Sequence, residues 1–137
     1  MKIDIRSATI DDKEFWFSLD KHISYEEYIK KIDLKECYIL FVDNMPSGIL
    51  RYNLFWDNTP FCNLLYIKES LQRKGLGRLL MDYFETKMKN LGYSYVLVST
   101  SINENGQFFY RELGYNDFGS LSFPWQEEDE LFLYKKI

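Results

Sequence analysis

The sequence predicts a mixed α/β (α+β) fold in a single domain over residues 1–137. Two apolar runs on either side of a Pro/Gly-containing turn, at 36–43 and 48–56, are typical of a β-hairpin. A strand pattern at 61–67, an amphipathic pattern at 77–91 and an apolar run at 93–99 are typical of a βαβ unit, whose parallel strands connect by a right-handed crossover. A chain of 137 residues that is 46% hydrophobic has the length and composition of one packed domain.

The N-terminal quarter of the chain predicts one strand and two helices. Residues 2–7 alternate between apolar and polar side chains, as a strand with one buried face does. Thr9 is followed by acidic residues, and both features favour a helix that begins near residue 10. Ser24 and Glu27 have the spacing of a capping box, so we expect a second short helix to follow Ser24.

The middle of the chain predicts the hairpin and the βαβ unit in detail. ECYILFVD and GILRYNLFW are the hairpin strands, and we expect their turn at 44–48, with a second turn at 57–60 before the strand FCNLLYI. The following helix ends at Gly92, and the apolar run after it is typical of a strand buried on both faces. The helix is expected to bury one face, which carries Leu76, Leu80, Phe84, Met88 and Leu91.

The last third of the chain predicts a helix and two strands. The helix covers 104–113 and ends at Gly114, and strands follow around 115–119 and 130–136. The loop between these strands, SLSFPWQEED, is rich in aromatic and acidic residues.

Charge and cysteine content exclude several classes of protein. The chain carries 17 basic and 21 acidic residues, a net charge of −4, which favours an amine or cationic partner over nucleic acid. Cys37 and Cys62 lie in apolar runs, so we expect buried free thiols and no metal site. The start of the chain resembles no signal peptide, and no window is long and apolar enough to span a membrane, so we expect a cytoplasmic protein without a membrane partner.

The segment QRKGLGR, between a strand and a helix, carries the strongest chemical signal. A helix N-terminus offers unpaired amides and the positive end of the helix dipole, which bind phosphate groups. Gly75 and Gly77 let the backbone approach a diphosphate closely, and the neighbouring arginines and lysine add positive charge. The two glycine-rich motifs of nucleotide-binding loops, GxxxxGK[ST] and GxGxxG, are absent. A tight turn with solvated charges would give the same letters, so the turn alone leaves both interpretations open.

A resemblance to a known family supports the phosphate-binding interpretation. QRKGLG is similar to the [Gln/Arg]-x-x-Gly-x-[Gly/Ala] signature of the GNAT superfamily of N-acetyltransferases. In SINENGQFFYRELGYNDFG, Asn103 precedes Tyr110 by seven positions, which resembles the family's N-x-x-A-x-x-x-Y-x-x-x-G-F region. Gly106 stands where the family usually has Ala, and Tyr115 replaces Phe. The motif-level similarity covers about residues 60–119, and the order of elements agrees over the whole chain.

The resemblance implies a fold, a co-substrate and a set of residues. The fold is a mixed, mostly antiparallel twisted sheet with a central splayed parallel strand pair and about four flanking helices. The co-substrate is acetyl-CoA, held without a metal, and the reaction is acetyl transfer to a primary amine by direct attack in a ternary complex. Residues implied to bind coenzyme A are Leu65, Tyr66, Ile67, Gln72, Arg73, Lys74, Gly75, Leu76, Gly77, Arg78, Asn103 and Tyr110. Tyr110 matches the family's proposed general acid. The strand FCNLLYI lacks the glutamate base that some family members have there, so we expect its Asn63 to hold a catalytic water instead.

The base and the acceptor stay open at this point. Asp57, Glu26, Glu27 and His22 are alternative bases, although each is a common kind of surface residue. For the acceptor we expect an aromatic slot with acidic neighbours: Tyr52, Phe55, Trp56, Phe123 and Trp125 with Asp57, Glu127, Glu128 and Asp129. The same rings could instead fill the core or cover the contact of a homodimer. The alternative function is a non-catalytic acyl-CoA-binding regulatory module.

Overall fold

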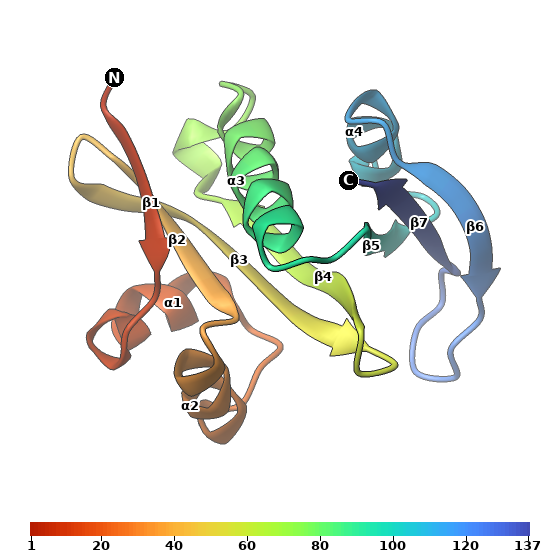
Figure 1. The fold of residues 1–137 in the computed structure, drawn as a ribbon, viewed down its shortest axis with the longest axis horizontal. Helices are drawn as coiled ribbons and strands as arrows, with labels where there is room; N and C mark the ends of the chain where they lie inside the picture. The colour runs from red at the N-terminus through yellow and green to blue at the C-terminus, as the bar shows by residue number, and fades with distance from the viewer. The chain divides into compact units, whose positions relative to one another are not determined.

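The computed structural model describes residues 1–137 and contains seven strands and four α-helices (Figure 1). The strands form one sheet in the order β1-β2-β3-β4-β5-β7-β6. β4 pairs with β5 in parallel, whereas β1–β2, β2–β3, β5–β7 and β6–β7 are antiparallel. This arrangement confirms the predicted mixed, mostly antiparallel fold class. The elements are β1 (Ile3–Ser7), α1 (Lys13–Leu19), α2 (Tyr25–Leu34), β2 (Cys37–Val42), β3 (Met45–Phe55), β4 (Thr59–Ile67), α3 (Leu76–Asn90), β5 (Tyr95–Ser101), α4 (Gly106–Glu112), β6 (Asn116–Leu121) and β7 (Glu130–Lys136), with short 3-10 helices at Ile10–Asp12 and Glu69–Leu71.

The chain divides into two compact units. The first unit contains residues 1–52 and 64–84, and the second contains residues 53–63 and 85–137. β3, β4 and α3 therefore each contribute residues to both units.

In the first unit, the side chains of β2 point alternately to two packed faces of the sheet. Cys37 and Ile39 lie in a buried cluster with Trp16 of α1 and Tyr28 of α2. Tyr38, between them in sequence, instead contacts the Tyr83 ring of α3 at 5.2 Å between ring centroids. Successive side chains of a strand point to opposite faces, so α1 and α2 cover one face of β2 and α3 covers the other.

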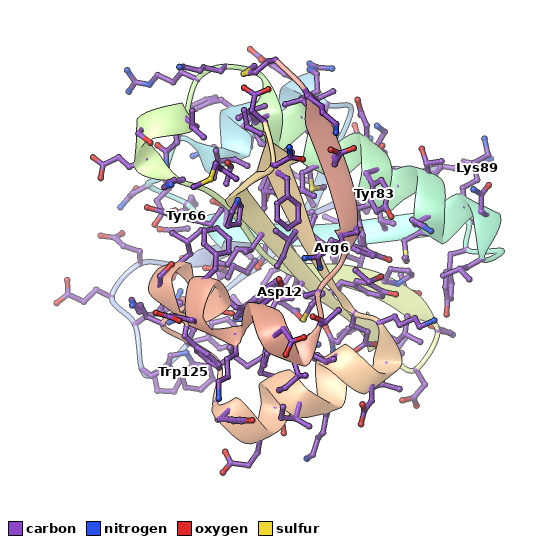
Figure 2. All side chains as sticks on the ribbon, turned by 90° about the vertical axis from the view of Figure 1, so that its left-hand side faces the viewer. Arg6, Asp12, Tyr66, Tyr83, Lys89 and Trp125 are labelled. Carbon is purple, nitrogen blue, oxygen red and sulfur yellow. The ribbon has the colours of Figure 1, made fainter.

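Local signals position the helices of the first unit. The Ser24 hydroxyl accepts a hydrogen bond from the Glu27 amide at 3.1 Å, which confirms the predicted start of α2. Asp12 accepts a hydrogen bond from the Thr9 amide at 2.7 Å and pairs with Arg6 at 2.8 Å (Figure 2). The first turn after Thr9 is a 3-10 turn, and α1 begins only at Lys13.

The second unit packs α4 and the end of α3 against β5 and β7. Its core contains the fully buried Val96, Val98 and Leu133 together with Cys62 and Tyr115. The register places Leu97 of β5 opposite Phe61 of β4 and Val98 opposite Cys62. Cys37 and Cys62 are both buried and form no disulfide, as predicted.

Three local predictions are wrong. The hairpin turn is Asp43–Asn44, both with positive φ (49° and 68°), so residues 45–48 belong to β3. Two consecutive left-handed residues fit the twist of a two-residue hairpin, and Asp and Asn tolerate that conformation. Leu91 lies beyond the end of α3 and is 64% exposed, whereas Met81 is fully buried. β5 is not buried on both faces, because Tyr95 is exposed and Leu97 and Ser99 are half-buried.

Candidate functional site

The connection from β4 to α3 is held by two hydrogen bonds within the first unit. The Lys68 amide donates to the Ser47 carbonyl at 2.8 Å. The Gln72 side-chain amide donates to the Ile67 carbonyl at 2.8 Å, which ties the predicted turn to the end of the strand before it. Gln72 thus has a structural contact that the sequence did not reveal.

The backbone of this turn is left-handed at two positions. Arg73 has φ 63° and Gly75 has φ 81°. A Cβ on Gly75 would meet no atom within 4 Å, so glycine is favoured there by its backbone conformation and not by lack of space. The first helical hydrogen bond of α3 runs from the Leu79 amide to the Gly75 carbonyl at 3.2 Å. The amides of residues 76–78 therefore have no partner within the helix.

The cationic side chains of the turn have no acidic partners. Arg73, Lys74 and Arg78 are exposed and take part in no ion pair. The three other arginines of the chain each pair with an aspartate at 2.8 Å: Arg6 with Asp12, Arg51 with Asp20 and Arg111 with Asp117. The two arginines without an acidic partner are thus both in the turn, next to helix amides that have no partner within the helix. This combination suits an anionic group.

The side chains of the remaining predicted residues of the first unit range from buried to exposed. Leu76 is 1% exposed, so its side chain belongs to the core and only its amide is available at the turn. Ile67 is also buried, Leu65 is half-buried and Tyr66 is 39% exposed (Figure 2). Gly77 lies in the first turn of α3.

Tyr110 is the most buried of the predicted catalytic groups. It lies in α4, is 8% exposed, and its ring contacts that of Tyr115 at 5.6 Å between centroids. Burial, with the nearby Cys62 thiol, raises the pKa of Tyr110 well above its ordinary value.

A buried network lies behind Tyr110. Glu85, 9% exposed, accepts hydrogen bonds from the Tyr115 hydroxyl and the Lys135 ammonium group, each at 2.7 Å. Burial and the Glu85 carboxylate raise the pKa of Tyr115, so its hydroxyl stays protonated and donates.

The two predicted asparagines are exposed and bound to neighbours. Asn63 on β4 donates to the Asn53 side-chain oxygen at 2.9 Å. Asn103, in the turn before α4, donates to Glu128 of the β6–β7 loop. Asn63, Asn103 and Tyr110 all belong to the second unit, whereas the predicted turn belongs to the first.

None of the alternative bases has a buried environment. His22, Glu26, Glu27 and Asp57 are all exposed. Glu27 forms a 3.2 Å ion pair with Lys30, an arrangement common on helix surfaces.

The expected aromatic slot is only partly present. Phe55 and Phe123 line a pocket of about 410 Å³ in the second unit. Trp56 and Trp125 are 82% and 76% exposed and lie outside its lining, and Tyr52 is buried beside Phe84. The four expected acids do not line the pocket either. The acid that does is Glu130, the first residue of the final strand, which no motif in the sequence marks as a site residue.

The structure offers neither a metal-ligand cluster nor a membrane-spanning helix. No group of three or more His, Cys, Asp or Glu side chains is arranged to hold a metal ion. No helix of the chain is long and apolar enough to cross a membrane.

A family model identifies the class of protein to which the chain belongs. The chain belongs to the acetyltransferase (GNAT) family, whose model matches residues 4–115. No curated protein sequence matches the chain significantly.

Solved structures resemble the chain over its whole length. Ard1 from Thermoplasma volcanium is 15% identical with a TM-score of 0.86, and the match covers 100% of this chain and 99% of that one. A GNAT-family acetyltransferase from Bacillus cereus is 26% identical with a TM-score of 0.79, covering 99% and 98%. A GNAT-family acetyltransferase from Elizabethkingia anophelis with acetyl-CoA bound is 18% identical with a TM-score of 0.76, covering 98% of each chain.

Proposed function

We propose that the chain transfers the acetyl group of acetyl-CoA to a primary amine by direct attack in a ternary complex. The observation that carries this proposal is the turn 72–78, where unpaired cationic side chains, a left-handed glycine and free helix amides come together. These are the groups that a pyrophosphate requires. Membership of the acetyltransferase (GNAT) family is consistent with acetyl-CoA as the molecule that carries this pyrophosphate.

Residues of the turn and of the neighbouring segments bind different parts of the coenzyme. Arg73, Lys74 and Arg78 neutralise the pyrophosphate charge, and the amides around Gly75 and Gly77 donate hydrogen bonds to its oxygens. Gln72 holds the turn against the end of β4 through the Ile67 carbonyl. The backbone of Leu65, Tyr66 and Ile67 holds the pantetheine arm as an added strand would be held, and Asn103 contacts that arm.

Tyr110 acts on the leaving group. The amine nitrogen bonds to the thioester carbonyl carbon, the carbon–sulfur bond breaks, and the sulfur keeps the electron pair. Because burial keeps its hydroxyl protonated, Tyr110 can donate to that sulfur. Its pKa lies well above about 8.5, an ordinary thiol value, so its main contribution is a hydrogen bond to the developing thiolate. The amine's own proton leaves to a water held by Asn63.

A screen of amines with acetyl-CoA, read by release of free thiol, tests the reaction. We expect the wild type to acetylate at least one amine and Tyr110→Phe to lower kcat by about 10²-fold or more, since removing one hydrogen-bond donor to a developing negative charge typically costs about 10²–10³ in kcat. Coenzyme A binding, measured by calorimetry, should be unchanged in this variant, because only the hydroxyl is removed.

The matched control is Tyr95→Phe, which removes a hydroxyl from an exposed ring and should leave both kcat and coenzyme A binding unchanged. A wild type that binds coenzyme A but acetylates no amine would instead be a non-catalytic binding module. Full activity in Tyr110→Phe would remove Tyr110 from the mechanism.

A further inference from the structure

The second unit contains an aromatic pocket. Its apolar walls come from the end of β3, from β4 and β7, and from β6 with the loop that follows it. Five residues form these walls: Phe55, Phe61, Leu121, Phe123 and Phe132. The Phe61 and Phe132 rings meet edge to face at 5.8 Å between centroids. A volume of about 410 Å³ lies within the ordinary range of small-molecule sites.

A carboxylate held by two hydrogen bonds is among the groups that line the pocket. The Glu130 oxygens accept hydrogen bonds from the Ser99 hydroxyl at 2.8 Å and from the Gln126 amide at 3.3 Å. All three residues line the pocket. Glu130 forms no ion pair, so its negative charge shares the pocket with aromatic residues and has no cation to balance it. Such an environment attracts a positive charge, both through the carboxylate and through the faces of the rings.

The pocket and Tyr110 lie on opposite faces of the same strand pair. Phe61, which lines the pocket, is followed on β4 by Cys62, which lies near Tyr110. Adjacent residues of a strand point to opposite faces. Ser99, on the pocket side, likewise follows the buried Val98, which pairs with Cys62. A ligand in the pocket therefore approaches the β4–β5 pair from the face that Tyr110 does not occupy.

We propose that this pocket binds the acceptor, and that the acceptor is an arylalkylamine: a small amine that carries an aromatic group close to its ammonium group. The inference rests on the proposed acetyl transfer and narrows its substrate class. The aromatic group packs among the phenylalanine rings, and the ammonium group faces Glu130, which Ser99 and Gln126 hold in place.

Equilibrium binding in the presence of coenzyme A, which has no acetyl group to transfer, tests the pocket separately from the reaction. The probes are 2-phenylethylamine, 2-phenylethanol, which lacks the charge, and propylamine, which lacks the ring. Calorimetry should show that 2-phenylethylamine binds at least tenfold more tightly than either control, because only it uses both the walls and the carboxylate. Equal binding of the amine and the alcohol would overturn the proposal.

Glu130→Gln and Glu127→Gln form a matched pair of variants. Glu127 is an exposed acid of the loop before β7 and does not line the pocket. Glu130→Gln should weaken 2-phenylethylamine binding about tenfold or more and leave 2-phenylethanol binding unchanged, since it removes the charge and keeps the shape. Glu127→Gln should change neither. An unchanged amine affinity in Glu130→Gln would contradict the assignment, and thermal unfolding of each variant checks that the fold persists.

The two proposals fail in different ways. If 2-phenylethylamine binds through Glu130 but is never acetylated, the pocket stands and acetyl transfer to this class fails. If acetylation occurs only with amines that lack a ring, or if only peptides that begin with an aromatic residue bind, acetyl transfer stands and the arylalkylamine assignment is overturned.

Discussion

At the scale of single residues, Glu85 supports the ring behind Tyr110. Tyr115 contacts the Tyr110 ring, and its hydroxyl donates to Glu85, whose other oxygen binds Lys135. A buried carboxylate requires both partners, because each hydrogen bond replaces water that burial has removed. The sequence departs from the family here, with Tyr115 in place of Phe, and the hydrogen bond to Glu85 is the physical reason for the hydroxyl.

Tyr115→Phe measures that support. The variant keeps the ring beside Tyr110 and removes one of the two bonds to Glu85, so we expect it to lower the free energy of unfolding by about 1–3 kcal/mol. Denaturant unfolding gives this value, and Tyr95→Phe on the exposed ring should change it by less than about 0.5 kcal/mol. A Tyr115→Phe protein as stable as the wild type would show that Glu85 does not depend on the hydroxyl.

The site residues differ in how far the sequence could predict them. The turn 72–78 was predictable because its glycines and cations are consecutive in the chain. Glu130 was not, because its partner Ser99 is 31 residues away and is brought near only by the β5–β7 register, in which Ser99 is opposite Phe132. A signal was present in the final strand, where Glu130 and Phe132 share one face, but nothing in the sequence indicated what that face meets.

At the scale of elements, the sequence predicted the type of each strand and helix better than its ends. The sequence predicts the hairpin turn at 44–48 instead of at Asp43–Asn44, because Pro46 and Gly48 are common turn residues. Both residues lie in β3. Gly48 has a packing role instead: a Cβ there would lie 2.6 Å from the Ile67 side chain. Tertiary contacts of this kind decide which glycines form turns, and a single sequence does not contain them.

Gly106, where the family usually has Ala, shows how closely α4 approaches β5. A Cβ on Gly106 would lie 2.6 Å from the Thr100 hydroxyl oxygen and 3.4 Å from its Cβ. Gly106→Ala should therefore lower the free energy of unfolding by about 1–3 kcal/mol, as overpacking does. The gain of about 0.5–1 kcal/mol that Ala usually brings to a helix is smaller than this loss.

A double-mutant cycle with Thr100→Ala tests the cause. Removing the hydroxyl should recover part of the loss, so the two substitutions should be coupled by about 1 kcal/mol or more in denaturant unfolding. Strictly additive effects would show that the Thr100 contact is not what requires glycine at position 106.

At the scale of the whole molecule, charge is distributed unevenly. The net charge is −4, and three of the five arginines are paired with aspartates, while Arg73 and Arg78 are left free at the turn. An acidic protein with one unpaired cationic turn can bind an anionic coenzyme there and still attract a cationic acceptor elsewhere. Glu130, in its aromatic pocket, is the corresponding negative site.

The central claim is that the turn around Gly75 binds coenzyme A, and calorimetric titration of coenzyme A tests it most directly. The comparison is between the wild type, Gly75→Val and Gly92→Val. Both glycines have positive φ (81° and 98°), and neither would meet an atom within 4 Å of an added Cβ, so the two substitutions strain the backbone alike. Only Gly75 lies in the turn. We expect Gly92→Val to bind coenzyme A as the wild type does and Gly75→Val to lose about 100-fold or more in affinity while remaining folded. A Gly75→Val protein that binds coenzyme A as tightly as the wild type would contradict the account.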